Sequence, residues 1–294
     1  MNKKLALMVT AVAVGGTMLA GTAATVMAQS SGYDIYKAAV LNIPTIKDAT
    51  AKADITVTDN GSVILTANDQ TKFNKNNNTT SSLNDVKYGT KELKTESYVQ
   101  DGKMINKTSD SDVYTVMERG QGKRVEKKAG SEDNQIKQGF QGIIDAYVGS
   151  RSDDFTATSN SDGTKTVNIK LDESQITPLD NAIVSFAVKA AGSGEFRNKQ
   201  EGISADLKAV IPQLTSDITV KAIDANALID SKNEIENQTT NITISGKDAD
   251  GKVHNIVITA KIALSDIDNT TPDKVDLTGK QIKTVTPQDF KRAK

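Results

Sequence analysis

The chain contains no cysteine and no tryptophan, and its only histidine is His254. Without cysteine it can form no disulfide, thiolate nucleophile, zinc–thiolate site or lipid-modified N-terminal cysteine. A single histidine excludes zinc motifs that need several imidazoles, and any serine triad would have to use this residue. No G-x-S-x-G segment supplies a nucleophile. The residue content therefore predicts a non-catalytic protein with no cofactor.

An excess of charge of one sign is also lacking. Lys and Arg number 36 against 37 Asp and Glu, which gives a formal net charge of −1. Such a balance provides no electrostatic footprint for nucleic acid or for an anionic membrane surface. Aromatic residues make up only 4% of the chain, so its core must consist of Ile, Val, Leu and Ala.

The first 28 residues have the features of an export signal. Lys3 and Lys4 precede an apolar run from Leu5 to Val26, and Ala28 is a small residue suited to the cleavage position. The sequence predicts a signal peptide over residues 1–28 that is removed after Ala28. The alternative is that the same run stays in the membrane as an anchor. With cleavage, residues 29–294 are expected to be secreted or bound to the cell envelope, with no transmembrane segment.

Four dipeptides with a strong tendency to form hairpin turns punctuate the chain. They are Asn60-Gly61, Asp101-Gly102, Asp162-Gly163 and Asp250-Gly251. Each lies between extended segments in which apolar and polar residues alternate, and such dipeptides readily adopt the positive φ of tight hairpin turns. Alternation with a period of two predicts strands with one buried and one solvent-facing side, and hence an antiparallel sheet.

Three amphipathic helices are predicted from apolar residues spaced three and four apart. The first contains Tyr36, Ala39, Val40 and Ile43, and Pro44 ends it. The second spans residues 136–147. The third is capped by Thr177, has Pro178 in its first position and ends at Gly192.

Two polar stretches, residues 74–85 and 231–238, are predicted as loops, and neither separates blocks of different composition. Residues 29–294 are therefore interpreted as a single α+β domain. One long curved antiparallel sheet, a half-barrel, is expected to carry the amphipathic helices on its concave face.

A leading amphipathic helix, long antiparallel hairpins and helices inserted between them resemble the bacterial lipoprotein-carrier half-barrel group, which includes the Lol-type carriers and the mycobacterial lipid-carrier lipoproteins. The segment YDIYKAAVLNI followed by the hairpin TAKADITVTDNGSVIL is also similar to exported proteins of unknown function from spore-forming Gram-positive bacteria. The resemblance implies an apolar cavity for acyl chains between the concave face and the helices. The chain departs from the group in having few large aromatic residues and no lipid anchor.

The predicted ligand cavity draws on the second and third helices and on one face of the last long strand. Its residues are Ile136, Phe140, Ile143, Ile144, Leu179, Ile183, Phe186, His254, Ile256 and Ile258. In the alternative interpretation the apolar residues are ordinary core. His254 is then a half-exposed residue at a strand end instead of a polar tip at the cavity mouth.

A cluster of aspartates near the C-terminus is the candidate for a calcium site. Its members are Asp266, Asp268, Asp273 and Asp276. Carboxylate oxygens are the ligands that calcium prefers. The alternative is that these residues are solvated turn formers whose side chains cap the local backbone, in which case no metal is bound.

Taken together, these features predict a non-catalytic exported or cell-envelope protein. Its expected partner is a lipid, another apolar or amphipathic ligand, or a component of the envelope. Two other functions stay open: a structural or interaction module of the cell wall or matrix, and an extracellular hydrolase.

Overall fold

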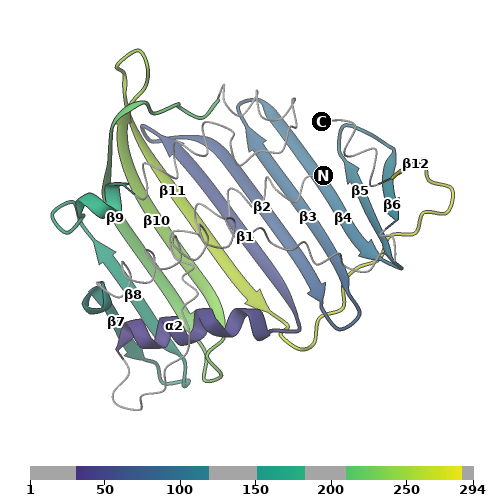
Figure 1. Ribbon diagram of the computed structural model, residues 1–294, viewed down its shortest axis with the longest axis horizontal. Coiled ribbons are helices and arrows are strands. Elements are labelled where there is room, and N and C mark those ends of the chain that lie inside the picture. The colour runs from purple at the N-terminus through teal and green to yellow at the C-terminus, as the bar shows by residue number, and fades with distance from the viewer. Residues whose placement is uncertain (1–30, 119–150, 183–209, 287–294) are drawn as a thin grey trace, which may run out of the picture.

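A twelve-stranded sheet dominates the computed structural model (Figure 1), which describes residues 31–118, 151–182 and 210–286. The strands are β1 (Asp48–Asp59), β2 (Ser62–Asn74), β3 (Thr79–Tyr88), β4 (Lys91–Gln100), β5 (Lys103–Thr108), β6 (Tyr114–Glu118), β7 (Phe155–Ser159), β8 (Lys165–Leu171), β9 (Ser216–Ile229), β10 (Ile235–Lys247), β11 (Val253–Ser265) and β12 (Ile282–Val285). The helices include α2 (Gly32–Asn42) and the short 3-10 helices Ile43–Thr45 and Ser152–Asp154. The predicted signal peptide and the predicted helix over 136–147 lie outside the described residues.

The sheet order is β12-β6-β5-β4-β3-β2-β1-β11-β10-β9-β8-β7. Strands β1 to β6 run from the centre to one edge, and β7 to β11 return from the other edge to the centre, where β11 pairs with β1. All pairs are antiparallel except β12 with β6. The sheet is curved and unclosed, so the predicted antiparallel half-barrel of the α+β class is confirmed. Residues 266–281 lead from the end of β11 to β12, which thereby comes to lie beside β6, a strand distant from it in the sequence.

All four predicted hairpin turns are present. Asn60-Gly61 and Asp101-Gly102 have positive φ at both residues, 48° and 83° in the first turn and 49° and 72° in the second. The other two turns have positive φ only at Gly163 and Gly251. They are longer loops, in which the N–H of Asp248, for example, donates to the carbonyl four residues later. A dipeptide thus specifies a hairpin at each site, although the loop length differs.

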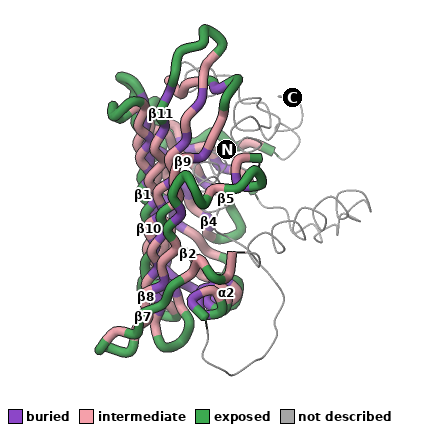
Figure 2. The backbone as a smooth tube through the Cα atoms, turned by 90° about the vertical axis from the view of Figure 1, so that its left-hand side faces the viewer, coloured by how far each residue is buried: buried purple, intermediate pink, exposed green. Residues whose placement is uncertain are grey.

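Helix α2 lies on one side of the sheet (Figure 2). Ser31 caps its N-terminus in a reciprocal arrangement with Asp34. The apolar face of α2 packs against the sheet near one edge, and this cluster consists of Ile35, Tyr36, Ala39, Val40, Val167, Ala227, Ile229 and Ile235. Because Val167 and Ala227 belong to the inner side of β8 and β9, α2 covers the concave face, as the sequence predicts.

A second core cluster occupies the concave face at the other end of the strands. It consists of Ile55, Val57, Leu65, Ala67, Val86, Tyr88, Leu214, Val220, Ile242, Ile244, Ile256 and Ala260. The strand members of this cluster are the inward positions of β1, β2, β3, β9, β10 and β11, which carry mostly Ile, Val, Leu and Ala. Burial of these apolar side chains is the main stabilising contribution of the concave face.

The two predicted loops are much shorter than expected. Residues 74–85 contain the end of β2, a turn over 75–78 and more than half of β3, and residues 231–238 include the start of β10. These predictions were wrong because they treated polar composition as a sign of a loop. Thr, Ser and Asn also occupy strands, and here they alternate between the two faces of the sheet.

The third predicted helix begins where expected. Thr177 Oγ1 accepts from the N–H of Asp180, and residues 178–182 are helical. The rest of its apolar stripe lies outside the described residues. Leu179, which was assigned to the buried face, is 43% exposed. Within the described ranges, no helix has the length and apolar character needed to cross a membrane.

Residues 266–281, named here the strap, connect β11 to β12 across the ends of the strands. The Thr270 N–H donates to Asp48 Oδ1 at 2.7 Å, and the Asp273 N–H donates to Ser81 Oγ at 2.9 Å. Further along, Val275 and Leu277 pack against Tyr98 and the cluster around Ile105. The strap therefore ties six consecutive strands together from the convex side.

Candidate functional site

The predicted cavity residues divide into three groups in the structure. Ile256 and Ile258 point to the concave face and belong to the core cluster or pack on it. Leu179 is exposed and is not part of that cluster. The remaining residues from the two helical stripes lie outside the described residues: Ile136, Phe140, Ile143, Ile144, Ile183 and Phe186.

His254 is buried, with 4% of its surface exposed, so it is not the half-exposed residue of the alternative interpretation. Its Nδ1 lies 2.8 Å from Asp59 Oδ2 and its Nε2 lies 3.1 Å from Asp248 Oδ2. Burial alone would lower the pKa of His254, but the hydrogen bonds to Asp59 and Asp248 outweigh it and raise the pKa above its ordinary value. The imidazole therefore joins the end of β1 to the β10–β11 turn.

The four aspartates of the calcium candidate do not converge. Asp273 binds the Lys72 ammonium at 2.9 Å, and Asp276 accepts from the Thr278 hydroxyl and N–H. Asp266 and Asp268 adopt positive φ, 52° and 60°, in the turn after β11. Among the described residues, no group of three or more potential ligands could hold a metal ion.

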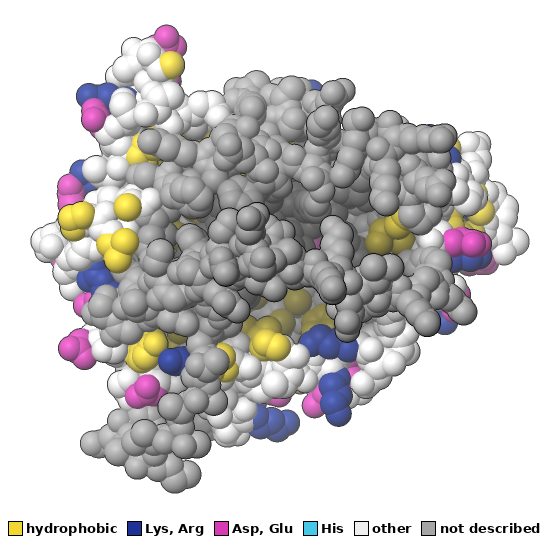
Figure 3. Space-filling model, viewed as in Figure 1, with side chains coloured by type: hydrophobic (Ala, Val, Ile, Leu, Met, Phe, Trp, Pro, Cys, Tyr) yellow, Lys and Arg dark blue, Asp and Glu magenta, His cyan; other side chains and the backbone are white. Residues whose placement is uncertain are grey.

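The concave face changes from apolar to polar along two rows of paired residues that cross six strands, from β11 to β5. The first row is Ile262, Ala53, Asp69, Asn84, Thr95 and Thr108, and the second is Leu264, Ala51, Thr71, Ser82, Ser97 and Asn106. In each row the two residues from β11 and β1 are apolar, and the four from β2 to β5 are polar. Figure 3 views this face and shows hydrophobic side chains near its middle.

The eight polar residues of these rows form a continuous patch, named here the polar grid. Thr71 Oγ1 lies 2.9 Å from Asp69 Oδ1, and Ser82 Oγ lies 3.1 Å from Asp69 Oδ2. The Asn84 amide donates to Ser82 Oγ at 3.0 Å, and Ser97 Oγ donates to Asn106 at 2.8 Å. Burial raises the pKa of Asp69, while the hydrogen bonds from Thr71 and Ser82 oppose that shift.

Apolar residues frame the polar grid on the same face. The inward positions on one side are Ala67, Val86 and Leu93, and those on the other side are Phe73, Thr80, Val99 and Met104, of which only Thr80 is polar. Ser82, Thr95 and Ser97 are buried, whereas the other five grid residues are half-buried. Sequence reasoning missed this patch because polar residues on one side of an alternating strand are ordinarily assigned to solvent.

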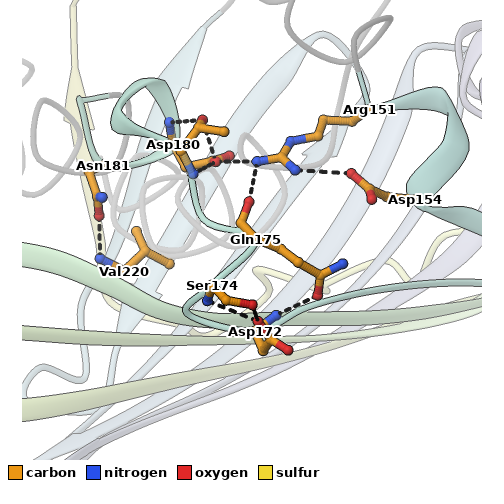
Figure 4. Close-up of polar contacts among 9 residues, drawn as sticks. Arg151, Asp154, Asp172, Ser174, Gln175, Asp180, Asn181 and Val220 are labelled. Atoms are coloured by element: carbon orange, nitrogen blue, oxygen red, sulfur yellow. Dashed lines mark hydrogen bonds and ion pairs between the residues drawn. The ribbon is translucent and has the colours of Figure 1, made fainter.

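A second polar cluster holds the start of the third helix against the sheet (Figure 4). Asp180 has a fully buried side chain and binds the Arg151 guanidinium, the Thr177 hydroxyl and the Thr177 N–H through one oxygen. Arg151 also donates to Asp154 at 3.1 Å. Asn181 Oδ1 accepts from the Val220 N–H of β9 at 2.6 Å. Arg151 and Asn181 connect the start of the helix to the segment before β7 and to β9, so we interpret this cluster as a structural clamp.

No protein-family model matches the sequence, and a search of the curated proteins finds no match. Among solved structures, the chain is similar to a β-barrel-like protein of a domain of unknown function, DUF1849, from Brucella abortus. The identity is 11% and the TM-score 0.17, over 75% of this chain and 99% of the other. A likeness at this level carries no argument about ligand or activity. The half-barrel assignment rests on the strand pairing described above, and the resemblance to lipoprotein carriers stays an expectation from the sequence.

Proposed function

We propose that this chain is a non-catalytic exported protein that binds an amphipathic ligand on the concave face of its half-barrel. The observation that carries the proposal is the change from apolar to polar along the two rows of the concave floor. Three apolar members of the rows keep part of their surface exposed, namely Ala51, Ile262 and Leu264. A ligand with one apolar and one polar part would match both halves of the floor.

The surroundings of His254 support a non-catalytic function over a hydrolase. A serine hydrolase needs an imidazole with one nitrogen held by a carboxylate and the other directed at a hydroxyl nucleophile. In this chain both ring nitrogens contact carboxylates, those of Asp59 and Asp248. No ring nitrogen is left to activate a serine or threonine.

Native mass spectrometry of the protein purified from its own host tests the proposal. We expect a bound amphiphile that organic extraction releases. The variant Ala51→Gln places an amide in the apolar part of the floor and should lose most of the bound material. Its control is Lys52→Gln, because Lys52 is the next residue of β1 and lies exposed on the opposite face. Absence of any bound amphiphile in the wild-type protein, together with no binding of added amphiphiles, would contradict the proposal.

A structural or interaction module of the cell wall or matrix is the second candidate, and one observation favours it. Among the described strands, β7 and β12 each have a neighbour on one side only. The side chains of β7 beyond Phe155 are exposed. Such edges could pair with another chain. Cell fractionation and sedimentation separate the two candidates, because a wall module would be retained in the wall fraction or self-associate.

A further inference from the structure

The chemistry of the polar grid restricts the part of a ligand that it can bind. Its eight residues comprise five hydroxyl side chains, two amides and the single carboxylate of Asp69. No basic residue is among them. A phosphate or sulfate head group would meet a carboxylate with no Lys or Arg of the grid to balance it, which is electrostatically unfavourable. Hydroxyl and amide groups can both donate and accept hydrogen bonds, so they match a neutral head group with the same property.

The hydrogen bonds within the grid leave one acceptor open. Both oxygens of Asp69 accept from hydroxyl groups, and the Asn84 amide nitrogen donates to Ser82. Asn84 Oδ1 is buried and accepts no hydrogen bond from the described part of the chain. A buried acceptor without a donor is unfavourable, and a hydroxyl group of a ligand would satisfy it.

The position of the grid adds a geometric condition. Thr71 and Asp69 are paired directly with Ala51 and Ala53, so the polar patch begins where the apolar floor ends. Burial of polar side chains lowers the stability of a protein unless all their hydrogen bonds are made. A patch of such side chains among apolar ones is therefore unfavourable if it serves only as part of the hydrophobic core. The same arrangement is suited to a ligand that carries a polyol at one end.

We propose that the polar grid is a binding site for a neutral polyhydroxyl head group, such as that of a glycolipid, whose acyl chain lies on the apolar floor formed by β1 and β11. This inference rests on the proposed function and specifies the class of its ligand. The hydroxyl groups of the head would exchange hydrogen bonds with Thr71 and the two amides, which are half-buried, and Asn84 Oδ1 would accept one of them.

Calorimetric titration with amphiphiles that share a twelve-carbon chain tests the head-group class. The probes are dodecyl maltoside, dodecylphosphocholine and dodecyltrimethylammonium, each below its critical micelle concentration, together with free maltose. We expect dodecyl maltoside to bind at least tenfold more tightly than each of the other three. Equal affinity for the three amphiphiles, or preference for the phosphocholine or the ammonium head, would overturn the inference and leave the proposed function standing.

Two further outcomes concern the proposed function itself. If free maltose bound as tightly as dodecyl maltoside, the apolar floor would contribute nothing and amphiphile binding would be wrong, while the polyol site would stand. If no probe bound, both proposals would be wrong. These comparisons use the unmodified protein, so they do not depend on the folding of a variant.

A pair of isosteric substitutions locates the site. Thr71→Val removes a grid hydroxyl without changing the shape of the side chain, and it should weaken dodecyl maltoside binding by about five- to tenfold. Thr66→Val is the matched control, because Thr66 lies on the same strand but on the convex face. It should leave the affinity unchanged. An equal effect of both variants, or no effect of Thr71→Val, would show that the grid is not the binding site.

Discussion

His254 and Asp59 lie 195 positions apart in the sequence, yet Nδ1 of one is 2.8 Å from Oδ2 of the other. Asp248 holds the second ring nitrogen, and the nearby charge of Lys252 opposes the effect of the two carboxylates. The pKa of His254 is raised in the folded protein, so the protonated ring contributes stability. This contribution is complete below the unfolded value of about 6.5 and is lost as the pH rises through the folded pKa.

We therefore expect the free energy of unfolding to fall as the pH rises from about 6.5 through the raised pKa of His254, and His254→Asn should remove this dependence. Urea unfolding at a series of pH values measures it. Asp250→Asn is the control, because Asp250 lies in the same turn and its side chain is exposed. A decline with pH that is the same in His254→Asn as in the wild type would show that another group is responsible.

Asp180 is the most buried acidic residue of the described chain, and its removal should be severe. Asp180→Ala leaves the Arg151 guanidinium, which is 12% exposed, without its buried partner and also removes the carboxylate that accepts from the N–H and hydroxyl of the N-cap residue Thr177. We expect a loss of about 3–5 kcal/mol in the free energy of unfolding, measured by urea denaturation. Asp172→Ala, which affects only an exposed turn with Ser174, should have a much smaller effect. Similar losses in the two variants would contradict the clamp.

Gly32 is required by the close approach of α2 to β7. A Cβ at this position would lie 2.8 Å from the carbonyl carbon of Thr156 and 2.9 Å from that of Phe155. Replacing glycine by alanine in a helix ordinarily stabilises it by about 0.5–1 kcal/mol. Because backbone atoms would have to move, we expect Gly32→Ala to destabilise the protein by about 1–3 kcal/mol instead.

Thermal or urea unfolding measures this effect, with Ala38→Gly as the control. Ala38 is exposed on the same helix, so Ala38→Gly should cost about 1 kcal/mol through helix propensity alone. The two substitutions are opposite in chemistry, and both should destabilise. A gain of stability in Gly32→Ala would mean that α2 does not approach β7 this closely.

Local features of the sequence were sufficient to predict much of the fold. The Asn60-Gly61 turn and the alternation of β1 predict a hairpin because turn chemistry and side-chain period act within a few residues. The strand over 79–88 was missed because its polar residues resemble a loop in composition. The pairing of β12 with β6 was also beyond prediction, since no local signal specifies which strands meet across a long connection.

The candidate site was less accessible to prediction than the fold. Alternation correctly placed His254 on the inward face, but it gave no indication that Asp59 would meet it, because that contact depends on the pairing of β1 with β11. The polar grid escaped notice for a related reason. Which face of β2 to β5 is concave is decided by the whole sheet, and each strand read alone assigns Thr71 and Ser97 to solvent.

The predicted export signal gives a test that needs no knowledge of the ligand. Cleavage after Ala28 should produce a mature chain that begins with Gln29, three residues before α2. Ala28→Arg should block cleavage, because the peptidase accepts only small residues at this position. N-terminal sequencing and intact mass of the exported protein measure the outcome, with Gln29→Arg as a control outside the −1 position. An exported protein that retains Met1 would favour the membrane-anchor alternative.

The Gln100 side chain of β4 binds the backbone of the strap with a pair of hydrogen bonds, as a neighbouring strand would. Gln100 donates through Nε2 to the Val275 carbonyl at 2.9 Å, and its Oε1 accepts from the Val275 N–H at 2.9 Å. Gln100→Glu keeps the acceptor but replaces the donor by a carboxylate oxygen that faces a carbonyl oxygen. We expect a loss of about 1–3 kcal/mol in stability and faster hydrogen exchange at the Val275 N–H.

Gln70→Glu adds the same charge to the convex face of β2, away from the contact between Gln100 and Val275, and should leave exchange at Val275 unchanged. If exchange at Val275 were as slow in Gln100→Glu as in the wild type, the strap would be held by its apolar contacts with Tyr98 and Ile105 alone.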